Sequence, residues 1–180
     1  VENNNGVFKT TRPPQSMGDI HRHFGNFAHK VRCLTYLLRL GSDGVKKMSC
    51  ISVLASSYLF SRLKKLYPTL PSGAHETPHM HEFIITLKDE QFKKIEDTGI
   101  PKAQVMAYVG KLFLDFGIHA PTVSFPEVYG HMIEPTESFS KEDLDRFSEV
   151  VEAIYDIINE RPDIIKNAPH FTPISKVNEV

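Results

Sequence analysis

The residues best suited to chemistry lie in two short runs, His119–Pro126 and Met132–Ser138, which hold a histidine, several hydroxyls and two carboxylates. Prolines interrupt both runs, and a proline fixes its own φ and restricts the residue before it. Polar side chains on a braced loop of this kind are typical of a binding edge. No complete catalytic set lies near them, so these residues predict a binding surface and do not name a reaction.

The two carboxylates, Glu134 and Glu137, flank a Pro-Thr pair. Two acids can divide the roles of general acid and general base. The alternative is that both precede a helix that begins after Ser140, where negative charge is favoured. A nucleophile is poorly supported, because Ser124 lacks a G-x-S-x-G context and the glycines form no phosphate-binding loop. We therefore assign no catalytic residue.

Histidines offer a second kind of site. His79 and His81 would share one face of a strand, as the two imidazoles of some zinc sites do. The candidates for a third ligand are Glu76, Glu82 and His119. The alternative is a polar loop that leads into an edge strand with surface histidines. Because the spacing fixes no third ligand, we expect no metal site and keep a histidine-based metal site as an alternative.

Composition excludes several classes of protein. The chain has 180 residues, 41% apolar and 24% charged, with a formal net charge of −1, so it has no global field for nucleic acid or an anionic membrane. No apolar run approaches the ~20 residues of a membrane span. Cys33 and Cys50 lie in helical patterns as core or near-core residues, and two isolated cysteines favour a reducing, cytoplasmic location. His21 and His23 could meet an anion at a helix N-terminus or remain solvated.

The elements that would position these residues form three parts: a polar arm or linker over 1–19, an α+β small domain over 20–160 and an irregular tail over 161–180. Apolar residues at three- and four-residue steps predict helices over 25–40 and 42–67, which a short turn at Gly41 would make an antiparallel pair. The inward residues of the first helix would be Phe24, Phe27, Val31, Leu34 and Leu38.

After residue 67 the sequence predicts both strands and helices. It predicts a loop over 68–79, a strand over 80–87, an exposed charged excursion over 88–100, a helix over 103–116 that ends at Gly117, strands near 122–125 and 129–134, and a helix over 140–160 that opens with a capping box at Ser140. Helices grouped on a small, mostly antiparallel sheet define an α+β fold.

Several passages, in order along the chain, carry a family resemblance. They are Phe24–Phe27 with a following helix that contains Tyr36, His81–Phe83, Leu114–Thr122, Glu134–Ser138, Lys141–Phe147 and Asn167–His170. Together they resemble the C-terminal domain of the glycine cleavage system P-protein, the pyridoxal-phosphate glycine decarboxylase that is also called glycine dehydrogenase (aminomethyl-transferring). The resemblance covers roughly residues 12–177, and the last passage resembles the tail of subunit 2 of the two-subunit form.

The resemblance implies the small domain of a fold-type I pyridoxal-phosphate enzyme. Its implied partners are the large cofactor domain, the other P-protein subunit, glycine and the lipoyl H-protein that accepts the aminomethyl group. The family's cofactor lysine follows a histidine, but His29–Lys30 lies on an amphipathic helix without the expected neighbours. We therefore expect this chain to bind no cofactor covalently and to be inactive alone.

The same resemblance implies which residues face the cofactor or substrate. They are His81, Glu82, His119, Thr122, Ser124, Glu134, Thr136 and Glu137. The hydroxyls would bind the substrate carboxylate or the cofactor phosphate, and His119 would orient a proton or an anion. The alternative function is a non-catalytic interaction module with the same fold.

Overall fold

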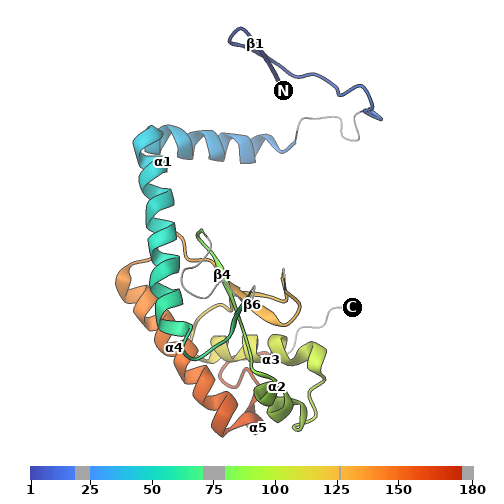
Figure 1. Cartoon of the computed structure of the whole chain (residues 1–180), viewed down its shortest axis with the longest axis vertical. Helices are drawn as coiled ribbons and strands as arrows, with labels where there is room; N and C mark the ends of the chain where they lie inside the picture. The colour runs from blue at the N-terminus through green and yellow to red at the C-terminus, as the bar shows by residue number, and fades with distance from the viewer. Residues whose placement is uncertain (19–24, 71–79, 126, 176–180) are drawn as a thin grey trace. The chain divides into compact units, whose positions relative to one another are not determined.

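The computed structural model describes residues 1–18, 25–70, 80–125 and 127–175 (Figure 1). The chain divides into two compact units, Val1–Val45 and Lys46–Val180.

A hairpin opens the first unit, where the sequence predicts only an arm. Strands β1 (Glu2–Asn4) and β2 (Val7–Lys9) pair antiparallel. The two residues between them, Asn5 and Gly6, both have positive φ, 52° and 85°. An Asn-Gly pair with positive φ at both positions is the favoured two-residue hairpin turn, so the pair was a usable signal.

Helix α1 (Phe27–Leu63) runs across the boundary of the two units and contains a kink at Gly41, with φ 64° and ψ −177°. Helical residues continue on both sides of Gly41. The turn that the sequence predicts between two helices therefore consists of Gly41 alone. The expected inward stripe of the first segment is exposed, with Phe27 77% and Leu38 74% accessible, while Phe24 lies outside the described residues. Cys33 and Cys50 are also exposed, and their core placement was wrong. The antiparallel packing of the two segments stays a prediction.

The second unit contains a four-stranded antiparallel sheet in the order β3-β4-β6-β5. The strands are β3 (Thr69–Leu70), β4 (Phe83–Thr86), β5 (Thr122–Val123) and β6 (Gly130–Ile133). The register pairs Phe83 with Ile133 and Ile85 with His131, and all four side chains are buried. Because side chains alternate along a strand, these four define the face of the sheet that meets the core.

Four helices follow in the second unit: α2 (Asp89–Glu96), α3 (Lys102–Asp115), α4 (Lys141–Glu160) and α5 (Pro162–Ile165). The prediction of an exposed excursion over 88–100 was wrong, because α2 buries Phe92 and Ile95 on one face. These two apolar residues, three positions apart, are enough to dock a short helix whose other positions are charged. Strand β3 was also missed, whereas the predicted helices over 103–116 and 140–160 are confirmed.

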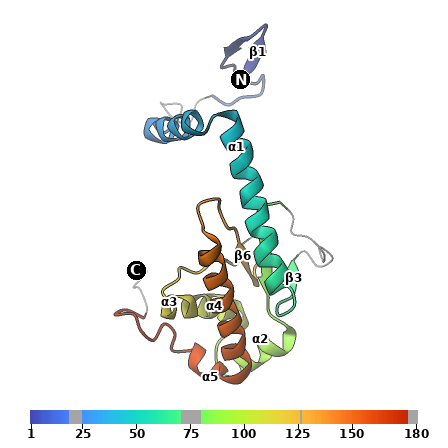
Figure 2. The ribbon, with the colours of Figure 1, turned by 90° about the vertical axis from the view of Figure 1, so that its left-hand side faces the viewer.

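One hydrophobic core joins the C-terminal part of α1 to the sheet and to α2, α3, α4 and α5. Both views draw α4 beside the end of α1, where Tyr58 and Arg62 bond Asp145 of α4 (Figures 1 and 2). The prediction of an α+β fold with helices on a small antiparallel sheet is confirmed. Among the described residues, no helix combines the length and the apolar character that crossing a membrane requires.

Candidate functional site: a groove beside the proline-braced runs

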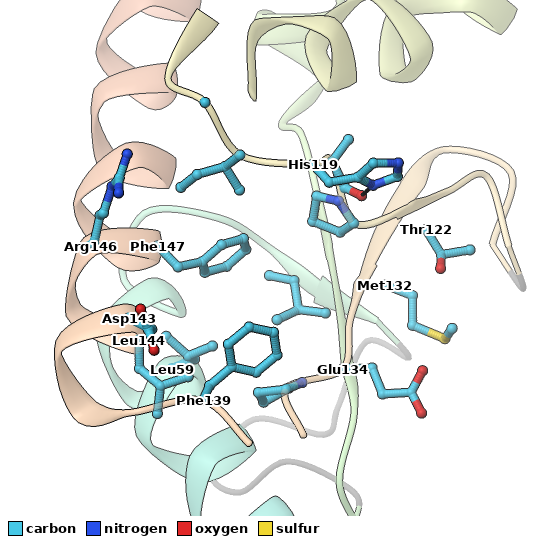
Figure 3. Close-up of a pocket in the computed structure, with 16 residues that line it drawn as sticks. Leu59, His119, Thr122, Met132, Glu134, Phe139, Asp143, Leu144, Arg146 and Phe147 are labelled. Atoms are coloured by element: carbon cyan, nitrogen blue, oxygen red, sulfur yellow. Dashed lines mark hydrogen bonds between the residues drawn. The ribbon is translucent and has the colours of Figure 1, made fainter. Parts of the chain in front are cut away.

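A groove of about 480 Å³ lies between the chain that follows α3, the end of β6 and the first turns of α4 (Figure 3). Its apolar wall includes Leu59, Ile118, Phe139, Leu144 and Phe147. Its polar side chains are His119, Thr122, Glu134, Asp143 and Arg146. A mostly apolar hollow with a few polar groups is the usual form of a small-molecule or segment-binding site.

The end of α3 builds one side of the groove. Gly117 has φ 71°, its N–H donates to the Leu114 carbonyl at 3.0 Å, and the Ile118 N–H donates to the Phe113 carbonyl at 3.0 Å. This pair of bonds is the Schellman motif, in which a left-handed residue ends the helix. The predicted stop at Gly117 is confirmed, and it turns the chain so that Ile118 to Thr122 border the groove.

The start of α4 builds the opposite side. Ser140 caps the helix by accepting from the Asp143 N–H at 3.1 Å, and the Asp143 carboxylate accepts from the Ser140 N–H at 3.0 Å. The predicted capping box is therefore confirmed. Hydrogen bonds from the Ser140 backbone and hydroxyl lower the pKa of the Asp143 carboxyl. At this end the groove therefore carries the Asp143 carboxylate together with the Arg146 guanidinium.

Two contacts from α4 hold its side of the groove against α3. Arg146 Nη2 donates to the Phe116 carbonyl at 3.2 Å, and the Phe147 ring stacks on Phe113 at a centroid distance of 6.0 Å. Leu144 and Phe147 lie in the helix that the sequence predicts over 140–160. Arg146, Phe139 and Leu59 were not anticipated, because only the tertiary fold brings them to the groove.

The eight predicted site residues divide into three groups. His119, Thr122 and Glu134 line the groove, and Figure 3 shows Thr122 and Glu134 on the same side of it. His81 and Glu82 meet Glu134 at the end of the β4–β6 pair, where His81 Nε2 lies 3.1 Å from Glu134 Oε1. The pairing of β4 with β6 brings these residues together.

The other three predicted residues do not belong to the groove lining. Ser124 has φ 58° and donates its N–H to the Gly130 carbonyl at 2.9 Å, within the connection between β5 and β6. The Thr136 hydroxyl lies 2.7 Å from the Ser138 hydroxyl. Glu137 lies on the same turn, half-buried. The candidate ligands Glu76 and His79, like the candidate anion pair His21 and His23, lie outside the described residues.

The side chains of the lining show which groups the groove can bind. Among the described residues that line it there is no lysine, cysteine or serine, so the lining holds no amine for a Schiff base and no activated nucleophile. His119 Nδ1 lies 2.9 Å from the Ala120 carbonyl, which orients the ring. The groove can hold an apolar group and present an imidazole, a hydroxyl and a carboxylate at its edge.

The sequence of this chain is similar to a known protein family and to several of its members. The profile of the family described as "Glycine dehydrogenase, C-terminal domain" matches residues 48–170. Proteins named "Probable glycine dehydrogenase (decarboxylating) subunit 2" are similar over nearly the whole chain. The one from Thermotoga maritima is 36% identical over 100% of this chain and 36% of its own length. The one from Pyrococcus horikoshii is 37% identical over 99% of this chain and 34% of its own length.

A solved structure is also similar, that of glycine decarboxylase (P-protein) of the glycine cleavage system in inhibitor-bound form. It has a TM-score of 0.48 and 21% identity, over 67% of this chain and 24% of that one. This chain spans about a third of the length of the curated relatives it matches. The family profile covers more than half of this chain, including every residue of the groove, and the chain belongs to the glycine dehydrogenase C-terminal domain family.

Proposed function

We propose that this chain is the part of a glycine dehydrogenase (decarboxylating) that closes one side of the reaction cavity. The observation that carries the proposal is the family match over 48–170, which contains the whole groove. The relatives are about three times as long as this chain, so the reaction itself is assigned to the complete protein. Glycine is the substrate that the names of the relatives indicate.

The pyridoxal phosphate of the complete enzyme is assigned to the rest of that enzyme. The described groove lining contains no lysine, and Lys30 lies on α1, in the first unit. The residues present therefore do not fit a covalent cofactor site. What this chain supplies is a wall: Phe139, Leu144 and Phe147 present apolar surface that would exclude water from the reaction.

The polar edge of the groove is proposed to face the substrate. Thr122 would donate a hydrogen bond to the substrate carboxylate or the cofactor phosphate, and His119 would orient an anion or a proton. Glu134 would also belong to this edge. His81 and Glu82 lie next to Glu134. Ser124, Thr136 and Glu137 lie on the adjoining turns, and we propose that they form the outer margin of the same surface.

Partners follow from the same proposal. Relatives named subunit 2 imply a second subunit, and we propose that the complete enzyme passes the aminomethyl group of glycine to the lipoyl group of H-protein. A cytoplasmic location is proposed on the basis of two free, exposed cysteines, which a reducing compartment protects.

The test compares the complete enzyme with the 180-residue chain in the exchange of labelled bicarbonate into glycine. We expect exchange by the complete enzyme with pyridoxal phosphate and H-protein. We expect none by the isolated chain with the same additions. Carbon dioxide release from glycine by the isolated chain, or an inert complete enzyme, would overturn the proposal.

A further inference from the structure

Three potential metal ligands gather where β4 begins and β6 ends. One ligand atom from each of His81, Glu82 and Glu134 lies within 4.8 Å of the other two. His81 Nε2 is 3.1 Å from Glu134 Oε1 and 4.0 Å from Glu82 Oε2. One imidazole nitrogen therefore lies close to two carboxylates that are far apart in sequence.

The register of the sheet explains why the two carboxylates meet. Phe83 pairs with Ile133 in an antiparallel ladder, so the preceding residue of one strand and the following residue of the other come opposite each other. These residues are Glu82 and Glu134. Like charges directly opposite across two strands destabilise the pairing, so a cation at this point would remove a cost that the fold otherwise carries.

We propose that His81, Glu82 and Glu134 bind a divalent first-row cation, for which Zn²⁺ is the probe. An imidazole nitrogen with two carboxylate oxygens is a donor set that Zn²⁺ accepts, and three protein ligands leave a fourth position open. Two carboxylates and one neutral imidazole also balance the charge of a divalent ion.

The ligand atoms already lie near the separations that a zinc ion requires. Ligands at about 2.0–2.2 Å from a tetrahedral zinc lie roughly 3.4 Å from one another, within the range of separations already present. The three side chains are 42%, 44% and 46% exposed, so they can adjust without disturbing the core. The ion would replace the direct contact between His81 Nε2 and Glu134 Oε1.

A cation here would join the ends of β4 and β6 and lie at the edge of the groove, because Glu134 belongs to both places. Its open position would present a Lewis acid to an anionic group at that edge. This site goes beyond the proposed function, and its test measures metal binding without any enzyme assay.

The experiment is calorimetric titration of Zn²⁺ into the full, chelator-treated 180-residue chain, with Co²⁺ absorption as a second readout. We expect one saturable ion per wild-type chain. His81→Ala, Glu82→Gln and Glu134→Gln should each weaken binding by roughly tenfold or more. His29→Ala is the matched control, because it removes an exposed histidine of α1, and it should bind as the wild type does.

Glu82→Gln and Glu134→Gln keep the shape of the side chains, so they report on the ligands even if His81→Ala is poorly folded by circular dichroism. The proposal is overturned if the wild-type chain shows no saturable Zn²⁺ binding. It is equally overturned if both glutamine variants bind Zn²⁺ as tightly as the wild type.

Discussion

Asp115, the last residue of α3, holds the chain at His170 through its side chain. Oδ1 accepts from the N–H groups of His170 and Phe171 at 2.5 and 3.1 Å, and Oδ2 lies 2.7 Å from His170 Nδ1. The Asp115 side chain is only 7% exposed. The same residue lies two positions before Gly117, where the groove begins, so the tail and one side of the groove share an anchor.

Replacing this anchor should loosen the tail. In Asp115→Asn the carboxylate is lost, and hydrogen bonds to a charged group contribute about 1.5–3 kcal/mol each to stability. We expect the free energy of unfolding in urea to fall by about 1–3 kcal/mol. The control is Asp156→Asn on the exposed side of α4, which should change it by less than about 0.5 kcal/mol. Equal losses in the two variants would show that Asp115 is an ordinary surface acid.

The Asp115 anchor should also respond to pH. Burial tends to raise the pKa of Asp115, but hydrogen bonds from His170 and Phe171 outweigh it, and the net pKa is lowered. A carboxyl with a lowered folded pKa stabilises the fold above its unfolded pKa, near ~3.9, and loses that contribution as pH falls through the folded value. The difference in unfolding free energy between wild type and Asp115→Asn should therefore be full at pH 6 and shrink below about pH 4. A constant difference down to pH 2.5 would contradict this account.

Much of the fold was predictable because local signals agreed with the tertiary structure. The capping box at Ser140 predicted the start of α4. Gly117 marked the end of α3. The failure at α2 has a physical cause: the helix is mostly charged, and its two buried apolar residues are recognisable only once the core they enter is known. The apolar pattern around Cys33 similarly predicted burial that the structure does not show.

The candidate site was predictable in part for the same reason. His119, Thr122 and Glu134 are predicted site residues because they are polar and lie beside prolines, and all three border the groove. Arg146 and Phe139 carry no local sign of their position, because the groove forms where α4 meets the end of α3. The pairing of Glu82 with Glu134 depends on strand register, which hydrophobic alternation alone does not set for strands this short.

His131 offers a second test of stability against pH. It is 2% exposed, its Nε2 lies 2.9 Å from the Met106 carbonyl, and burial lowers its pKa to about 4. An unfolded histidine titrates near ~6.5, so between these values the unfolded chain binds more protons than the folded one. Stability should be level above about pH 7 and fall by about 1.4 kcal/mol per pH unit as pH decreases through this window.

The matched variant is His131→Phe, which keeps a ring beside Phe113 and removes the titrating group. Its free energy of unfolding should change much less between pH 7 and pH 5 than that of the wild type. His29→Ala, which alters an exposed histidine, should retain the wild-type slope. Equal slopes in the wild type and His131→Phe would assign the pH dependence to other groups.

The isolated chain should not form the internal aldimine of a pyridoxal-phosphate enzyme. The described groove lining has no lysine, so added pyridoxal phosphate should give no stoichiometric band near ~420 nm. The measurement is a spectral titration followed by borohydride reduction and peptide mapping. A single lysine labelled in proportion to protein would refute the assignment of the cofactor to the rest of the enzyme.

A substitution at Thr122 tests directly whether the polar edge of the groove faces the substrate. In the complete enzyme, Thr122→Ala removes one hydroxyl from the groove, and a hydrogen bond to a charged group contributes about 1.5–3 kcal/mol. Glycine–bicarbonate exchange should therefore fall by roughly 10- to 100-fold, with an unchanged Tm because Thr122 is exposed. Thr122→Ser keeps the hydroxyl and should recover most of the activity, while Glu149→Ala on the exposed side of α4 should behave as wild type. The Ala and Ser variants differ only in the hydroxyl group. Wild-type exchange by Thr122→Ala would therefore show that Thr122 does not face the substrate.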